Sequence, residues 1–409
     1  MPDEKFPYCS NILEKTINLE TTMLKTFPLD SRAKTTALKQ PKELFVYART
    51  ADGKYVYGDE DVQKEHLLYY YFPDSYVDKQ LDLTQGYSKF KKIPDEENTG
   101  DFEALLKGIM DYEKKSGNKI GCDIITFRGL MTKLMLLPYN LTEPLDLYVV
   151  SYDGQLFIKS DDEKELKKKG EEIEKVSPAE QDFRTRCEYS GYKFEALCTL
   201  PRPWSECDRD TIERRYQKTV NNYEQYLSMV RTGIGNVKLA LAGEVDGAWD
   251  YLPREGSPLG HYVELKTSRA IMSPGQLPGF EKKLLKTWAQ CFLIGIKRVV
   301  YGFRDDDLIL RNVELYNTEE IPILLKDSVS DRPKFNCTNA LKWYGAVIQW
   351  LASSIPRDEF RLWKLNYDPG SHIFSVSEAM SEDSLKNNII TNEFRQWRLS
   401  LATAAKEGS

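Results

Sequence analysis

Two short stretches near the middle of the chain, LAGEVDGAW and HYVELKTS, limit most strongly what it can fold into. Each alternates charged with apolar residues: Glu244 and Asp246 flank a valine, and Glu264 and Lys266 flank a leucine. Because successive side chains of a β-strand point to opposite faces, each pair of charges shares one face of a strand. The seventeen residues between Asp246 and Glu264 are enough to bring a second strand beside the first. The sequence therefore predicts two strands whose charged faces meet in one patch.

Such a patch holds three carboxylates and one ammonium group, and it is unfavourable unless something neutralises it. Two like unit charges about 4 Å apart repel by roughly 4 kcal/mol at an effective dielectric constant near 20. A ligand set made only of oxygen atoms suits Mg²⁺ or Mn²⁺ and not zinc. The lysine can then stabilise charge that develops on a phosphate, or orient an attacking water. The pattern is that of PD-(D/E)xK nucleases; the alternative is a polar strand edge that faces solvent.

Glu195 and Arg128 are further candidates for the same site. Glu195 lies in the largely apolar and aromatic stretch SGYKFEALCTLP, where a carboxylate is either salt-bridged in the core or a ligand. Arg128 lies in TFRGLMTKLM, where an expected strand enters an expected helix, and its alternative role is structural. From these residues alone, both alternatives stay open for each side chain.

Composition limits the class of protein. The chain has 409 residues, a net charge of −6 and no Pro/Gly-rich linker, so it can build one large domain. Its acidity excludes a generally basic nucleic-acid-binding protein, although a local basic groove is compatible with it. Three histidines and seven scattered cysteines without a CxxC pair argue against zinc and favour a reducing compartment. No stretch resembles a signal peptide or approaches the roughly 18 apolar residues of a membrane helix, so we expect a soluble protein.

Turn signals and apolar periodicity predict the order of elements. The pairs Asp52-Gly53 and Asp153-Gly154 predict tight β-hairpins. We further expect hairpins at 224–249 and 297–315, a strand entering a helix at 122–138, buried helices at 279–296 and 339–354, and a solvated helix or loop at 159–176. Strands and helices intermix without strict alternation, which favours an α+β fold. We expect an irregular segment at 1–40 packed on the body, one domain with a large mixed sheet and flanking helices at 41–376, and a polar helical tail at 377–409.

Four motifs, taken in order, resemble those of the DXO family of RNA 5′-end decapping enzymes. The family pattern is an arginine, then G-Φ-x-Φ-E, E-Φ-D and E-Φ-K, where Φ is bulky and apolar. Here these motifs are Arg128, GYKFE (191–195), EVD (244–246) and ELK (264–266), and the Trp-x-Gln of the following helix is Trp288 and Gln290. The resemblance covers about residues 127–307. The flanking text is most similar to the fungal nuclear branch, whose members accompany the nuclear 5′–3′ exoribonuclease.

The resemblance implies a set of metal ligands. Glu195, Asp246 and Glu264 would bind a divalent cation, Mg²⁺ or Mn²⁺, together with the backbone carbonyl of Leu265. Glu244 would take part through a water or through a second metal. The fold that the resemblance implies has an active-site core similar to that of PD-(D/E)xK nucleases.

The resemblance also implies residues that act on the phosphate. Lys266 and Gln290 would position the nucleophilic water and the scissile phosphate, which makes them, with Glu244, the implied catalytic residues. Arg128 would hold phosphate from the other side, where its planar fork suits two oxygens. The implied reaction is hydrolysis at the RNA 5′ end, releasing pyrophosphate from a triphosphate or removing an incompletely methylated or NAD-type cap. The product is 5′-monophosphate RNA, ready for exonucleolytic decay.

Other functions remain open at this point. The chain could mainly stabilise a nuclear 5′–3′ exoribonuclease, with Trp204 in the stiff loop LPRPW as a candidate contact, or it could carry 5′–3′ exonuclease activity of its own. A DNA nuclease of the PD-(D/E)xK type is a third reading, against which the Glu195 motif argues. We expect a nuclear location, with the cytoplasm as the alternative. Structural roles are expected for His66, His261 and His372, and packing for the tyrosines at 69–71, whose alternative role is to stack on RNA bases.

Overall fold

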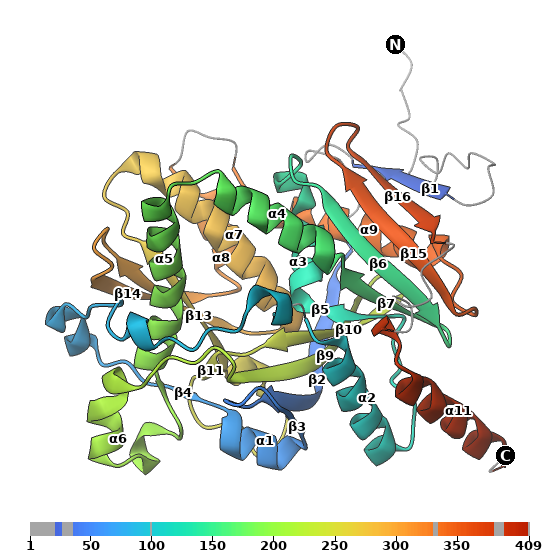
Figure 1. Ribbon diagram of the computed structural model, residues 1–409, viewed down its shortest axis with the longest axis horizontal. Coiled ribbons are helices and arrows are strands. Elements are labelled where there is room, and N and C mark those ends of the chain that lie inside the picture. The colour runs from blue at the N-terminus through green and yellow to red at the C-terminus, as the bar shows by residue number, and fades with distance from the viewer. Residues whose placement is uncertain (1–20, 27–35, 99, 330–333, 380–387, 408–409) are drawn as a thin grey trace.

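The structure, a computed structural model, describes residues 21–26, 36–98, 100–329, 334–379 and 388–407 (Figure 1). Its strands form two sheets. The larger sheet has ten strands in the spatial order β1 (Thr21–Lys25), β16 (Ile373–Glu378), β15 (Arg361–Asp368), β6 (Leu145–Tyr152), β7 (Gln155–Ser160), β5 (Ile124–Phe127), β10 (Val237–Glu244), β9 (Gln225–Ile234), β2 (Leu38–Arg49) and β3 (Tyr55–Tyr57). The smaller sheet has six strands in the order β14 (Leu310–Asn317), β13 (Arg298–Arg304), β12 (Tyr262–Arg269), β11 (Gly247–Ala248), β4 (Tyr69–Tyr70) and β8 (Thr199–Leu200).

The helices of the described chain are α1 (Asp59–His66), α2 (Phe102–Ser116), α3 (Arg128–Leu136), α4 (Asp162–Glu174), α5 (Pro178–Leu197), α6 (Arg209–Arg214), α7 (Leu277–Ile294), α8 (Ile321–Lys326), α9 (Cys337–Ser354) and α11 (Asn392–Glu407). Of these, α3, α7 and α9 pack on one face of the larger sheet, and α2 and α11 pack on the other. Both sheets contain parallel and antiparallel pairs. The expected α+β class is therefore confirmed, with the expected mixed sheet divided into two.

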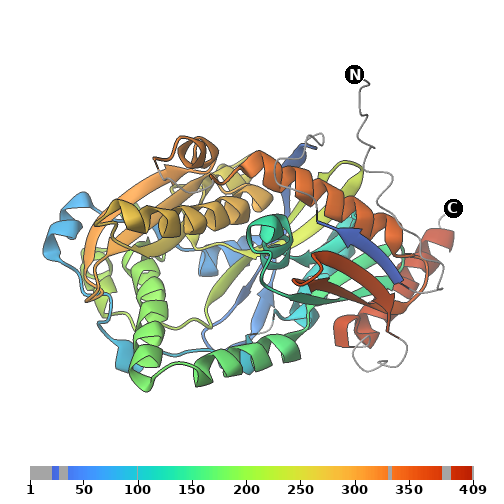
Figure 2. The ribbon, with the colours of Figure 1, turned by 90° about the horizontal axis from the view of Figure 1, so that it is seen from above.

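The central strand β10 shows why the larger sheet needs covering on both sides. Leu239 and Leu241 pack in a core with α3, α7 and α9, whereas Ala240 and Ala242 face a second core with α2 and α11. The view from above shows α7 and α9 along one side of the molecule and α4 along the opposite side (Figure 2). A strand buried on both faces has a nearly continuous apolar sequence, as β10 does.

The two predicted hairpin turns are confirmed. In the first, β2 and β3 pair in antiparallel fashion and Gly53 has φ +82°. In the second, β6 and β7 are joined by Asp153 and Gly154 alone, with φ +50° and +76°. A two-residue hairpin loop of this kind needs positive φ at both positions, which aspartate tolerates and glycine favours.

Most of the other predicted elements are also confirmed. The hairpins β9–β10 and β13–β14, the β5–α3 junction, and helices α4, α7 and α9 lie where the patterns placed them. The 1–40 segment departs from its description as irregular, because Thr21–Lys25 forms a strand that pairs with β16. Residues 1–20 and 27–35 lie outside the described residues, so the packing predicted there stays a prediction, as do the domain boundaries. The tail is helical at α11, although β16 runs to Glu378.

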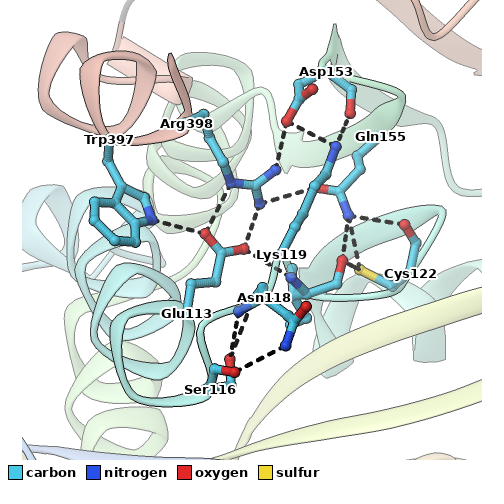
Figure 3. A network of polar contacts seen from close by, with 10 residues as sticks. Glu113, Ser116, Asn118, Lys119, Cys122, Asp153, Gln155, Trp397 and Arg398 are labelled. Atoms are coloured by element: carbon cyan, nitrogen blue, oxygen red, sulfur yellow. Dashed lines mark hydrogen bonds and ion pairs between the residues drawn. The ribbon is translucent and has the colours of Figure 1, made fainter. Parts of the chain in front are cut away.

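The last helix is attached to the body by a buried polar network (Figure 3). Arg398 of α11 donates to Glu113 of α2, with Nε 2.9 Å from Oε2 and Nη2 2.8 Å from Oε1. It also donates to Asp153 in the β6–β7 turn at 2.8 Å and to Gln155 at 3.1 Å. Trp397 donates its indole N–H to the same Glu113 carboxylate at 2.9 Å. The network joins three segments that are far apart in the sequence.

No helix in the described part of the chain is both long and apolar enough to span a bilayer. The cysteines that the structure describes are all free thiols.

Candidate active site

The two charged stretches meet where the chain passes from one sheet to the other. β10 ends at Glu244, and the chain enters the smaller sheet at Gly247, so Asp246 stands in the crossing and not on the strand that was predicted to carry it. The chain leaves the larger sheet just after Val245, whose N–H donates to the carbonyl of Tyr226, because Ala248 then pairs with the smaller sheet. The strand that lies beside the ELK strand β12 after this crossing is therefore the short β11, which pairs with it in antiparallel register.

The predicted convergence of charges is nevertheless present. Glu264 and Lys266 share one face of β12, and Lys266 Nζ lies 2.6 Å from Glu264 Oε1 and 3.6 Å from Asp246 Oδ2. Asp246 Oδ2 also accepts the backbone N–H of Leu265 at 2.6 Å, which fixes the crossing segment against β12. Glu264 is almost fully buried at 2% exposure.

Arg128 approaches the same carboxylates from the larger sheet. It is the first residue of α3, directly after β5, which runs parallel to β10. Its Nη2 lies 3.9 Å from Glu264 Oε2 and donates to the backbone carbonyl of Glu244 at 3.3 Å. Gly243 makes this approach possible, because a Cβ at that position would stand 3.3 Å from Arg128 Cβ and Nε. The strand–helix junction predicted for Arg128 is confirmed.

Glu195 reaches the cluster from α5, a helix that we did not predict. A local signal for it exists: Ser177 caps the helix by accepting the N–H of Glu180, and Pro178 occupies the first helical position. Glu195 lies in the last turn of α5, which packs against β12 of the smaller sheet. Within the described residues, its carboxylate has no ion-pair partner.

Three of the acidic residues have raised pKa values, as expected where carboxylates outnumber the cations beside them. Burial, followed by the neighbouring Asp246 carboxylate, raises the pKa of Glu195 well above its usual value. Burial raises the pKa of Asp246 to about 6, against the opposing effect of Lys266. The dense protein around Glu244 and the Asp246 carboxylate raise the pKa of Glu244 to about 7, although water reaches that side chain.

Glu264 and Lys266 are held in their charged forms. Against burial, which acts in the other direction, Lys266 and then Arg128 hold the pKa of Glu264 below its ordinary value. Burial likewise opposes the charge of Lys266, but the surrounding carboxylates, led by Asp246 and Glu264, raise the pKa of Lys266 well above its usual value. The cluster contains four carboxylates and two cationic side chains. When all of them are ionised it carries two surplus negative charges, which one divalent cation would neutralise.

The side-chain donors of the cluster are of the kind that a hard divalent cation binds, although they do not enclose one as they lie. Glu264 Oε2 is buried without a hydrogen-bond partner, which is costly for a carboxylate oxygen unless a ligand fills the place. All side-chain donors are oxygens, as Mg²⁺ and Mn²⁺ prefer. No three His, Cys, Asp or Glu side chains of the described chain enclose a metal as they lie. The Lys266 ammonium stands between Glu264 and Asp246, and at 30% exposure it has room to move aside.

Gln290 lines a cleft that both sequence neighbours of Arg128 also line. It is partly exposed on α7, whereas Trp288 is buried in the core and stacks on Phe292 at 5.1 Å between ring centroids. The cleft has a volume of about 700 Å³ and is lined by Gln290, by residues of α7 and by residues of α3 that follow Arg128. The structure therefore brings Gln290 to the same side of the molecule as Arg128.

Of the remaining predicted residues, Trp204, Tyr70 and His372 each contact another side chain. Trp204 is 62% exposed and stacks on Tyr71 at 6.4 Å, so it is not a core residue. Tyr70 stacks on Trp249 at 4.7 Å between ring centroids, so the rings of Tyr70 and Tyr71 both already stack on aromatic side chains of the protein. His372 contacts the hydroxyl of Tyr367 at 2.9 Å, a structural contact, as expected for this residue.

Three comparisons with known proteins agree with one another. A model of the family described as RAI1-like PD-(D/E)XK nuclease matches residues 39–395. A relative from Debaryomyces hansenii, named decapping nuclease RAI1, is 62% identical over 93% of this chain and 99% of its own. The crystal structure of Candida albicans Rai1 in complex with pU5 and Mn²⁺ is 56% identical, has a TM-score of 0.88, and covers 92% of this chain and 99% of that one. Scheffersomyces stipitis Rai1 with 3′-NADP⁺ and calcium is 53% identical, with a TM-score of 0.86 over 92% and 100%.

Proposed function

This chain belongs to the RAI1-like family of PD-(D/E)XK nucleases, and from that premise we propose that it hydrolyses RNA at the 5′ end. Membership in this family confirms the resemblance to decapping enzymes that the four motifs indicated. The protein is a hydrolase, and a divalent cation is its cofactor class, as the Mn²⁺ complex of the Candida albicans relative indicates.

One observation carries the proposal. Residues from four separate elements, namely α3, α5, the β10–β11 crossing and β12, bring Arg128, Glu195, Asp246, Glu264 and Lys266 to one place. A cluster with two surplus negative charges and an adjacent lysine and arginine can hold a cation and a phosphate together. A divalent cation bound there would supply Lewis-acid polarisation of a phosphoryl oxygen and a lowered pKa for an attacking water.

The chain's own residues divide the remaining work. Glu195, Asp246 and Glu264 would hold the cation with the Leu265 carbonyl. Glu244, at the end of β10 and two residues before Asp246, would accept a proton from the nucleophilic water.

Three further residues would contact the substrate. Arg128 presents its guanidinium beside Glu264, where it can grip a phosphate and balance charge in the transition state. Lys266 would orient the water or the phosphate from the other side. Gln290 can donate to the same phosphate from the cleft.

The substrate follows from the relatives. The Candida albicans protein was solved with a 5′-phosphorylated oligouridylate and the Scheffersomyces stipitis protein with 3′-NADP⁺. We therefore assign to this chain the release of pyrophosphate from 5′-triphosphate RNA and the removal of incompletely methylated or NAD-type caps. The product of each reaction carries a 5′-monophosphate.

A release assay tests this function. RNAs that carry a 5′-triphosphate, an unmethylated cap or an NAD cap are incubated with the protein and Mg²⁺ or Mn²⁺, with duplex DNA as the competing substrate. We expect metal-dependent release of pyrophosphate or cap nucleotide, and its loss in the Glu244→Ala/Asp246→Ala variant with the fold retained. Preference for duplex DNA, or wild-type rates from the double variant, would contradict the proposal.

The exposed Trp204 supports a second role, that of a partner for a nuclear 5′–3′ exoribonuclease. A ring that is 62% exposed and held by Tyr71 from behind is a rigid aromatic anchor of the kind that dominates interfaces. This role implies a nuclear location and is compatible with catalysis. Trp204→Ala should abolish co-purification with such an exoribonuclease and leave pyrophosphate release intact; co-purification that survives the substitution would sink the assignment of this surface.

A further inference from the structure

The cleft beside Gln290 is lined by more lysines than acidic residues. The lysines come from three elements and are Lys133 of α3, Lys159 of β7, and Lys282, Lys283 and Lys286 of α7. Three acidic residues, Glu143, Asp162 and Glu165, line the same cleft. This is a local basic surface on a chain whose net charge is −6.

Ion pairs divide these lysines into two groups. Lys133 is paired with Glu165, and Lys159 with Asp162 at 2.7 Å. The lysines of α7 have no ion-pair partner among the described residues, and Lys283 has only the hydroxyl of Ser268, at 3.3 Å. The α7 side of the cleft therefore presents the uncompensated positive charge.

Three side chains of α7 form a row that leads to the catalytic cluster. Lys282, Lys286 and Gln290 are four residues apart, so they lie on one stripe of the helix, about 6 Å apart along its axis. Both lysines are exposed, and the residues between them on the other faces, Leu284 and Leu285, are buried. The surrounding protein, and then the charges of Lys133, Lys266 and Arg128, lower the pKa of Lys286, although water reaches its side chain.

We propose that Lys282 and Lys286 bind two successive phosphates of the RNA strand downstream of its 5′ end, in a track along α7 that delivers this end to the catalytic cluster. The spacing of the row is on the order of the distance between neighbouring phosphates of an extended single strand, which basic grooves follow along its backbone. The proposal rests on the proposed function in one respect, namely that the strand in the cleft is RNA. Lysine ammonium groups act here as point charges and carry no sequence preference.

The length of the RNA separates the track from the chemistry. Wild-type protein and the Lys282→Ala/Lys286→Ala variant are compared on a 5′-triphosphorylated dinucleotide and on an octanucleotide. We expect only a small loss of kcat/KM for the variant on the dinucleotide, whose single internucleotide phosphate reaches Lys286 alone, and roughly a ten-fold lower kcat/KM on the octanucleotide at low salt. An octanucleotide that the variant hydrolyses as fast as the wild type would overturn the proposal.

Binding without turnover gives an independent measurement. For a 5′-monophosphorylated octanucleotide, in the absence of metal, the slope of log affinity against log salt should be smaller by about 1.4 in the variant, since each phosphate neutralised on a single strand contributes about 0.7. The Lys282→Arg/Lys286→Arg variant should restore the slope. An unchanged slope contradicts the track even if the protein proves to hydrolyse no RNA, so failure of the proposed function is distinguishable from failure of this one.

A matched control removes the same charge elsewhere. Lys64 at the end of α1 and Lys326 at the end of α8 are exposed and lie outside the cleft. The Lys64→Ala/Lys326→Ala variant should keep the wild-type length dependence and salt slope. A loss equal to that of the α7 variant would show that net charge alone is responsible, and would overturn the proposal.

Discussion

Gly302 on β13 and Phe194 on α5 occupy adjoining space with no room for a further atom. A Cβ at position 302 would stand 2.6 Å from Cε2 of the Phe194 ring and 2.8 Å from Cδ2 and Cζ. Phe194 is fully buried, and the next residue along α5 is Glu195. The closeness of Gly302 and Phe194 therefore sets how far the Glu195 carboxylate reaches toward β12, which pairs with β13.

Gly302→Ala should consequently lower both stability and activity. The added methyl group must displace the Phe194 ring, and overpacking of a core costs about 1–3 kcal/mol. We expect a lower Tm and at least a several-fold loss of pyrophosphate release, because α5 and Glu195 move together. The Gly302→Ala/Phe194→Leu double variant makes room for the methyl group and should recover part of both. If the single variant kept full activity, the packing would not control the position of Glu195.

The raised pKa values of Glu244 and Asp246 predict how stability depends on pH without metal. A carboxyl group whose pKa is higher in the folded than in the unfolded state binds its proton more tightly when folded, so stability falls as pH rises. With pKa values of about 7 and about 6, the loss should extend from near pH 4 to near pH 7. Glu264, whose pKa is lowered, acts in the opposite sense. Its contribution to the stability of the fold is lost only as pH falls below the usual pKa of a glutamate.

Thermal unfolding followed across this range, with chelator and with Mn²⁺, checks the prediction. In chelator the Tm should decrease as pH rises, and Mn²⁺ should remove most of that decrease because it binds the ionised carboxylates of the folded state only. The Glu244→Gln/Asp246→Asn variant should show a flatter profile and little response to Mn²⁺. Identical profiles with and without Mn²⁺ would mean that the cluster does not bind the cation.

How well the sequence predicts a structural feature depends on whether the residues that determine this feature are close together in the sequence. The tight turn at Asp153-Gly154 and the apolar stripe of α7 are determined by residues that are neighbours in the sequence, and both were predicted correctly. The strand expected to hold Asp246 ends two residues earlier, since the switch between sheets depends on pairing with Tyr226 and Leu68, which lie far away in the sequence. The role of Gly302 was equally invisible, because it is defined by Phe194 from another element. The convergence of the acidic residues was predictable from alternation and motif order, but not which sheet supplies each of them.

Arg398 and Glu113 form a buried pair, and removing one partner should destabilise the protein more than removing both. Glu113 is 0% and Arg398 4% exposed. Arg398→Ala leaves the Glu113 carboxylate buried with only Trp397 and a backbone donor, and breaking a buried pair costs about 3–5 kcal/mol. We expect a large fall in the free energy of unfolding, measured by denaturant titration. The Arg398→Met/Glu113→Leu double variant removes both charges and should be far more stable than Arg398→Ala; equal destabilisation would show that the helix contact, and not the unpaired charge, is responsible.

Lys266 offers a way to separate cation binding from hydrolysis. Its ammonium lies 2.6 Å from Glu264 Oε1 and 3.6 Å from Asp246 Oδ2, so it competes with a metal for the same oxygens and also faces the phosphate site. In Lys266→Met the competition is gone, and Mn²⁺ affinity measured by calorimetry should be retained or increased. Hydrolysis should fall by about 100-fold or more, which is the usual cost of losing one preorganised hydrogen-bond donor to the transition state. A variant that loses Mn²⁺ binding instead would show that Lys266 holds the carboxylates in place for the metal, and its part in the chemistry would then have to be reassigned.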